Sequence, residues 1–182
     1  MLPCISIRLN NLIKAMETVV APALDQNQVF ALEQSTLIVA HLKMLSNQWD
    51  AAYCFELGSL DNMVNLAIHL THLTPHTEAS QAALLALSAT LKNPPSEPPP
   101  TVSAVTQRLR EIGLKVDNFI DQVMQTESST VKSQLTGIVL DYNQCQSARE
   151  RVWFKDNHLD SGISDLSTFE EMLYGNHYRF KP

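Results

Sequence analysis

Two stretches in the second half of the chain carry the same spacing of apolar residues. The first advances in alternating steps of three and four: Val102, Val105, Leu109, Ile112, Val116, Phe119 and Val123. The second advances in steps of four and three, with one arginine in the series: Val131, Leu135, Ile138, Tyr142, Cys145, Arg149 and Val152. These steps average close to the helical period, so each series forms one stripe along a helix. Because only the polar segment 125–130 separates them, we expect a long antiparallel helical hairpin over about residues 101–154.

The N-terminal quarter of the chain also has helical periodicity. Apolar residues between positions 5 and 19 repeat the same alternation and predict a helix that stops near Pro22, since proline disfavours helical geometry in the residue before it. Over residues 24–57 the pattern stays helical, and the sequence leaves open whether this is one helix or two.

Glycine and hydroxyl residues mark the expected ends of the next helices. Gly58 is expected to end the preceding helix, because glycine tolerates the left-handed conformation found there. Ser59 and Thr77 are expected to cap two further helices, which end near Pro75 and Leu91 respectively, and Thr101 is expected to cap the first arm of the hairpin. In the last third, Ser167 and Glu170 fit a capping box ahead of a short helix.

A proline-rich segment, residues 93–100, is the best candidate for a boundary. We therefore expect an N-terminal helical bundle over 1–92, a connector over 93–100, and a hairpin with a short C-terminal helix and tail over 101–182. The third part is expected to pack on the first as one globular unit. Only 5 glycines in 182 residues leave little turn material for a many-stranded fold. The expected class is thus an all-α helical bundle of about six or seven helices.

Composition excludes several classes of function. A net charge of −6 argues against general binding of nucleic acid or of anionic membranes. No stretch approaches the roughly 20 apolar residues of a membrane span, and the N-terminus lacks a secretory signal pattern. Three widely spaced cysteines, Cys4, Cys54 and Cys145, are typical of reduced thiols in a cytoplasmic protein.

Formal charge is scarce between Asn62 and Lys92, where only Glu78 and Lys92 carry it. Helices with so little charge are expected to be buried on more than one side, either inside a monomer or at a subunit contact. We expect part of this region to form a homodimer or partner surface. The candidate interface residues are Met63, Leu66, Leu70, Leu73, Leu84, Leu87 and Leu91.

Three histidines in the same region, His69, His72 and His76, form a weaker candidate. Their spacing would put three imidazoles on one helical face, and imidazole suits zinc, copper, iron or nickel. However, Pro75 falls before the third histidine, and no Glu-x-x-His pair of the di-iron type occurs. No cofactor is expected apart from this weak possibility of a divalent transition metal.

The open end of the expected hairpin collects basic residues, which are Arg108, Arg110, Arg149, Arg151 and Lys155. They form either a weak anion-binding patch or a salt-bridged, solvated surface. For the arginine within the apolar stripe, we expect the stem to lie along the seam while the guanidinium reaches water.

No catalytic or phosphate-binding glycine motif occurs, so an enzyme is less expected than a binding protein. The sequence favours a cytoplasmic helical-bundle protein that acts by protein association, as an adaptor, chaperone-like or regulatory factor. Its expected partner is a second copy, as a homodimer, or another protein. The alternative is a metal- or ligand-binding helical enzyme that uses the region of His69 and His72.

Overall fold

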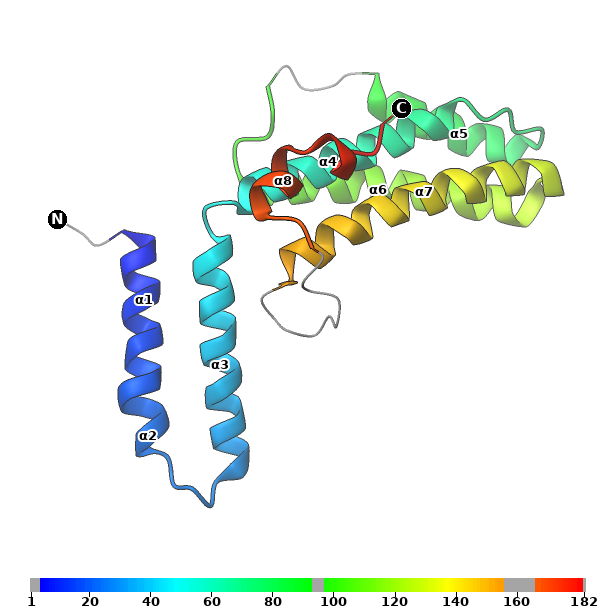
Figure 1. The fold of residues 1–182 in the computed structure, drawn as a ribbon. Helices are drawn as coiled ribbons and strands as arrows, with labels where there is room; N and C mark the ends of the chain where they lie inside the picture. Colours follow the sequence, from blue (N-terminus) through cyan, green and yellow to red (C-terminus); the bar gives the residue numbers. More distant parts are fainter. Residues whose placement is uncertain (1–3, 93–96, 156–165, 182) are drawn as a thin grey trace. The chain divides into compact units, whose positions relative to one another are not determined.

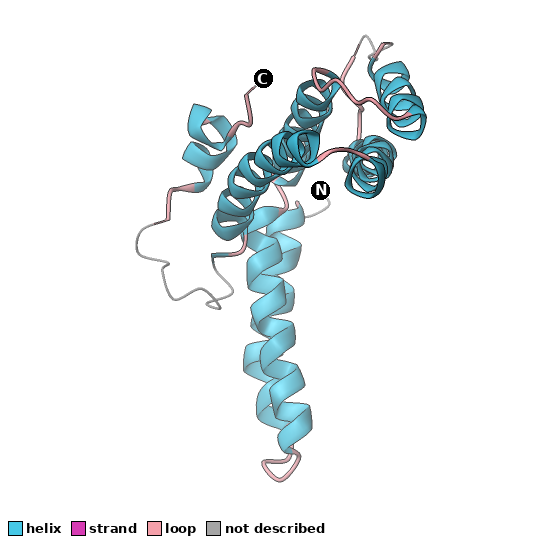
Figure 2. Cartoon of the chain, turned by 90° about the vertical axis from the view of Figure 1, so that its right-hand side faces the viewer, coloured by secondary structure: helices cyan, strands magenta, loops and turns pink. Residues whose placement is uncertain are grey.

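The computed structural model describes residues 4–92, 97–155 and 166–181, and every regular element in these ranges is a helix (Figures 1 and 2). The protein is therefore all-α, as the sequence predicts. The chain divides into two compact units, Met1–Ala51 with Trp153–Leu166 and Ala52–Val152 with Ser167–Pro182. The division falls at Ala51 rather than in the proline-rich connector. Residues 93–96 of that connector lie outside the described residues.

The first unit is built on two antiparallel helical arms (Figure 1). The first arm consists of α1 (Ile5–Ala15), a π-helical turn (Met16–Val20) and α2 (Ala21–Ala23), and the second is α3 (Val29–Gln48). The first arm ends at Ala23, so the predicted stop near Pro22 is confirmed, and this proline lies in the first turn of α2. There its missing N–H costs little, since the first N–H groups of a helix have no intrahelical acceptor.

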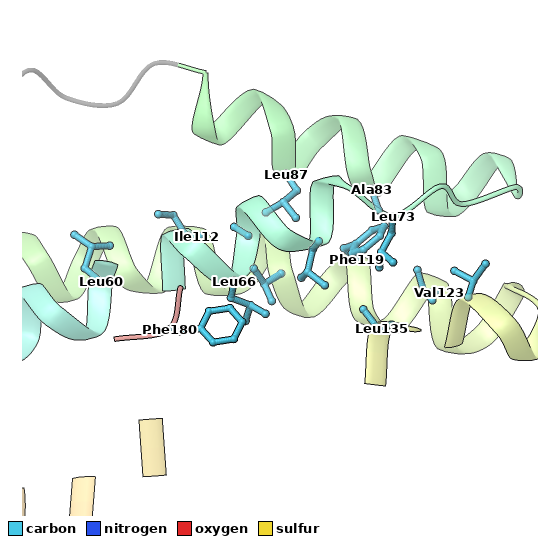
Figure 3. Close-up of a cluster of buried hydrophobic side chains, with 14 of the residues drawn as sticks. Leu60, Leu66, Leu73, Ala83, Leu87, Ile112, Phe119, Val123, Leu135 and Phe180 are labelled. Atoms are coloured by element: carbon cyan, nitrogen blue, oxygen red, sulfur yellow. The ribbon is translucent and has the colours of Figure 1, made fainter. Parts of the chain in front are cut away.

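The second unit contains α4 (Ala52–Thr71), α5 (Glu78–Leu91), α6 (Val102–Thr126), α8 (Phe169–Tyr174) and a 3₁₀ turn (Asn176–Tyr178). It also holds α7 (Ser129–Trp153) up to Val152. Helices α6 and α7 double back on each other, which confirms the predicted hairpin (Figure 1). Apolar side chains of α4, α5, α6 and α7 meet in one core (Figure 3).

The predicted stripes supply much of this core. Val105, Ile112, Val116, Phe119 and Val123 of α6 are all buried, at 2% exposure or less. From α7, Val131 and Leu135 join the same cluster, and Ile138, Tyr142 and Cys145 pack against it. The alternation of three and four residues was thus a reliable guide to the buried face.

Hydroxyl caps begin several of these helices. The Thr77 side chain accepts a hydrogen bond from the Ser80 N–H, and Thr101 accepts one from the Ala104 N–H, which confirms both predicted caps. The capping box of α8 is formed one residue later than predicted, by Thr168 and Glu171. Either register satisfies the S/T-x-x-E pattern, so the sequence alone could not choose between them.

The predicted helix end at Gly58 was wrong. Helix α4 runs without interruption through Gly58 and Ser59, and the break that separates it from α3 falls instead at residues 49–51. A glycine followed by a serine resembles the end of one helix and the cap of the next. Here the glycine is required by a side chain that packs against it, as described below.

Candidate functional sites

The two helical arms of the first unit expose many large apolar side chains. Eighteen large hydrophobic residues are exposed in the described structure, and eleven of them lie between residues 5 and 49. No apolar residue of α1, α2, α3 or the π-helical turn is buried. The exposed residues are Ile5, Ile7, Leu12, Val19, Val20, Val29, Phe30, Leu37, Ile38, Leu45 and Trp49.

Helix α3 is apolar around its whole circumference. At 100° per residue, its apolar positions point in every direction, and Glu33 and Lys43 are its only formally charged residues. A helix of this kind is normally buried on all sides. The first arm covers one side of α3. On other sides, the side chain of Phe30 remains 73% exposed and that of Leu37 remains 51% exposed. Sequence reasoning missed this surface, although the scarcity of charge in α3 was a usable signal.

The predicted interface residues lie within the core of the second unit. Leu66, Leu70, Leu73 and Leu87 are buried at 8% exposure or less, and Met63, Leu84 and Leu91 pack against the same cluster (Figure 3). The missing charge between residues 62 and 92 is therefore explained by burial within one chain. No second copy is needed to cover these side chains.

The three histidines do not form a common ligand face. Helix α4 ends at Thr71, so His76 lies beyond it, where its backbone N–H donates to Glu127 Oε1 at 2.9 Å. The His69 ring packs against Phe180, with 5.0 Å between the ring centroids. Within the described residues, no three His, Cys, Asp or Glu side chains are grouped to hold a metal ion.

The basic residues of the hairpin end have different surroundings. Arg108 donates to the carbonyl of Thr90 at 2.9 Å and forms an ion pair with Glu111 at 3.3 Å. Arg110 and Arg151 are exposed, whereas Lys155 belongs to the first unit. Arg149 is not a surface residue at all.

Arg149 is the largest fully buried side chain in the described structure, at 1% exposure. The expectation that its guanidinium reaches water was therefore wrong. Nη2 donates to the carbonyl of Phe55 at 2.9 Å, and Nη1 donates to the carbonyl of Met172 at 3.4 Å. The guanidinium also lies 5.2 Å from the centroid of the Phe55 ring. These contacts connect α7 with α4 and α8.

Arg149 also lines a small pocket of about 140 Å³ in the second unit. The rim carries the exposed residues Cys54, Asp61, Tyr174 and Arg179. Partial burial raises the pKa of Asp61, and the charges of Arg179 and Arg149 oppose that rise. Burial lowers the pKa of Arg149. The pocket thus holds two guanidinium groups and one carboxyl group.

In the described residues, no helix is both long enough and apolar enough to cross a membrane. Comparison of the chain with models of protein families, with curated proteins and with solved structures finds no match.

Proposed function

We propose that this protein acts by protein association, and that the helical arms of the first unit, α1–α2 and α3, form the contact surface with a second copy of the chain. The observation that carries the proposal is the complete lack of buried apolar residues in these arms, beside ten exposed large ones. Short helices in water gain most of their stability from packing of an apolar face. Two arms without a core therefore need a partner to cover them.

The dimensions of the arms suit a dimer. A helix of about 20 residues is about 30 Å long and about 10 Å wide, so two helices side by side present a face of about 600 Å². Two such faces would bury about 1,200 Å² in total, which is the lower end of the range for a specific interface. Two helical hairpins that pack in this way form a four-helix bundle.

The charge of the arms also permits self-association. Residues 4–51 carry Arg8, Lys14 and Lys43 against Glu17, Asp25, Glu33 and Asp50, a net charge of −1. Two copies would therefore repel each other only weakly, and Arg8 or Lys14 of one copy has acidic residues available in the other. A cytoplasmic location remains part of the proposal, because the widely spaced cysteines are typical of that compartment.

The oligomeric state in solution tests this proposal. Light scattering behind gel filtration is expected to give twice the 20.3 kDa mass of one chain at micromolar concentration. Leu37→Glu should shift the mass toward one copy, because it places a charge on the exposed face of α3. Leu85→Glu is the matched control, since Leu85 of α5 is 70% exposed outside the arms. It should leave the dimer intact.

Two results would overturn the proposal. One is a wild-type chain with the mass of a single copy throughout the micromolar range. The other is a dimer that resists Leu37→Glu and Phe30→Glu but dissociates with Leu85→Glu, which would move the interface to the second unit. Substitution of Leu70 is not informative here, because its side chain is fully buried and a charge there would disrupt the core.

A further inference from the structure

The buried guanidinium of Arg149 has hydrogen-bonding capacity that the protein does not use. A guanidinium carries five N–H donors. Two of them donate to the carbonyls of Phe55 and Met172, whereas Nε has no partner in the described structure. Three N–H groups therefore remain, one on each nitrogen. Buried donors are normally satisfied, so this group calls for an explanation.

The charge of Arg149 is compensated only from a distance, by Asp61 in the lining of the same pocket. Among the described residues, no carboxylate oxygen lies within 4.0 Å of its guanidinium. Burial of an ion without a counterion costs several kcal/mol unless other groups replace water around it. Two carbonyls and the face of Phe55 supply part of that replacement. An anion beside the guanidinium would supply the rest.

The pocket beside Arg149 has the size and charge for such an anion. A volume of about 140 Å³ is enough for a small molecule of several non-hydrogen atoms. Arg149 and Arg179 together carry two positive charges, and Asp61 carries one negative charge when ionised. A monoanion would balance the resulting net charge of +1, whereas a dianion would leave an excess negative charge in a partly buried site.

We propose that this pocket binds the carboxylate group of a small monoanionic organic acid. Arg149 lines the pocket, and an Nη–H group of its guanidinium that has no acceptor in the described structure is the donor for a carboxylate oxygen there, whereas Nε is covered by protein atoms. Arg179 at the rim adds a second, solvent-exposed cation. The site lies wholly within the second unit, so it does not depend on the association surface proposed above.

Acetate is the probe for this site, and nuclear magnetic resonance of the ¹⁵N-labelled full chain is the measurement. Sodium acetate replaces sodium chloride at constant ionic strength, and the Nε–H signal of Arg149 is followed. A saturable shift with acetate, absent with chloride, is expected. An unchanged or non-saturating signal would overturn the proposal, and tighter binding of inorganic phosphate would overturn the assignment to a carboxylate.

Variants that leave Arg149 in place connect the binding to this pocket. Arg179→Gln removes an exposed charge and should raise the half-saturating acetate concentration at least threefold. Gly58→Ala should abolish the shift, because a Cβ at residue 58 would lie 2.6 Å from Nη2 and would displace the guanidinium. Gly137→Ala is the matched control, since its Cβ would meet nothing within 4 Å. Binding unchanged in both test variants would reject the site.

Discussion

The guanidinium of Arg149 occupies the space that a side chain at Gly58 would need. A Cβ built on Gly58 would lie 2.6 Å from Nη2 and 3.0 Å from Cζ of Arg149. Gly58 lies in the interior of α4, where glycine is less favourable than alanine by about 1 kcal/mol. The glycine therefore accommodates a buried arginine from a helix more than 90 residues later in the chain.

This relationship predicts opposite effects for two glycine-to-alanine substitutions. Gly137→Ala, on an exposed face of α7, should stabilise the protein by about 0.5–1 kcal/mol through helix propensity alone. Gly58→Ala should instead destabilise it by about 1–2 kcal/mol, because displacement of the guanidinium breaks its hydrogen bonds to Phe55 and Met172. Urea unfolding followed by circular dichroism measures both. Equal stabilisation by the two substitutions would contradict the role assigned to Gly58.

The sequence was informative wherever local periodicity decided the structure. The hairpin of α6 and α7 and the caps at Thr77 and Thr101 were predictable, because each depends on residues a few positions apart. The helix boundary at Gly58 was not, since the reason for the glycine lies in Arg149. A glycine near a serine has the same local signature whether it ends a helix or receives a distant side chain.

The division into units and the candidate sites were less accessible to sequence reasoning. Low charge between residues 62 and 92 and low charge in α3 look alike in the sequence, yet the first region is core and the second is exposed. Tertiary packing decides which of two apolar helices is buried by other parts of the same chain. The pocket beside Arg149 likewise combines residues from α4, α7 and the C-terminal segment, a juxtaposition that no local pattern records.

Asn62 is predicted to hold the C-terminal segment on α4. Its buried amide accepts a hydrogen bond from the Phe180 N–H at 2.9 Å and donates to the Tyr178 carbonyl at 3.3 Å, so it brackets the exposed Arg179. Asn62→Ala should release this segment and cost about 1–3 kcal/mol, because a buried N–H and carbonyl lose their partners. Trypsin should then cleave after Arg179 faster than in the wild type, as measured by mass spectrometry of the intact chain.

Two further variants serve as comparisons for the cleavage rate of Asn62→Ala. Asn65→Ala removes one hydrogen bond, to the Phe180 carbonyl at 2.7 Å, and should accelerate cleavage less than Asn62→Ala. Asn118→Ala, at an exposed position of α6, should leave the rate unchanged. Equal cleavage rates in all three variants would mean that the segment is held by other contacts, such as the packing of Phe180 on Tyr142 and His69.

Cys4 and Cys145 are predicted to react with iodoacetamide at different rates. The thiolate is the reactive form, so a lower pKa and greater exposure both favour alkylation. Cys4 is exposed, and a hydrogen bond with Ser6 lowers its pKa. Cys145 is partly buried, and burial raises its pKa. Mass spectrometry of timed samples near neutral pH should show modification of Cys4 well before Cys145. The reverse order would contradict the packing described for α7.

Glu127 is predicted to make the stability of the second unit depend on acid pH. Its Oε1 accepts hydrogen bonds from the Thr77 N–H, the Thr77 hydroxyl and the His76 N–H, each at 2.9 Å, and the bond from the Thr77 N–H is the main reason that its pKa lies below the usual 4.5. Because the pKa of Glu127 is lower in the folded state, its ionised carboxylate contributes fully to stability above the pKa of the unfolded chain. That contribution is lost as pH falls through the pKa of the folded protein.

Glu127→Gln should therefore destabilise the protein at neutral pH, and the difference in stability from wild type should shrink as pH falls below 4.5. Urea unfolding at several pH values measures this trend. Glu78→Gln, an exposed substitution at the same end of α5, is the control for loss of one carboxylate from this region. A difference between wild type and Glu127→Gln that stays constant down to the acid transition would show that the ionised form of the carboxylate is not what stabilises the contact with Thr77 and His76.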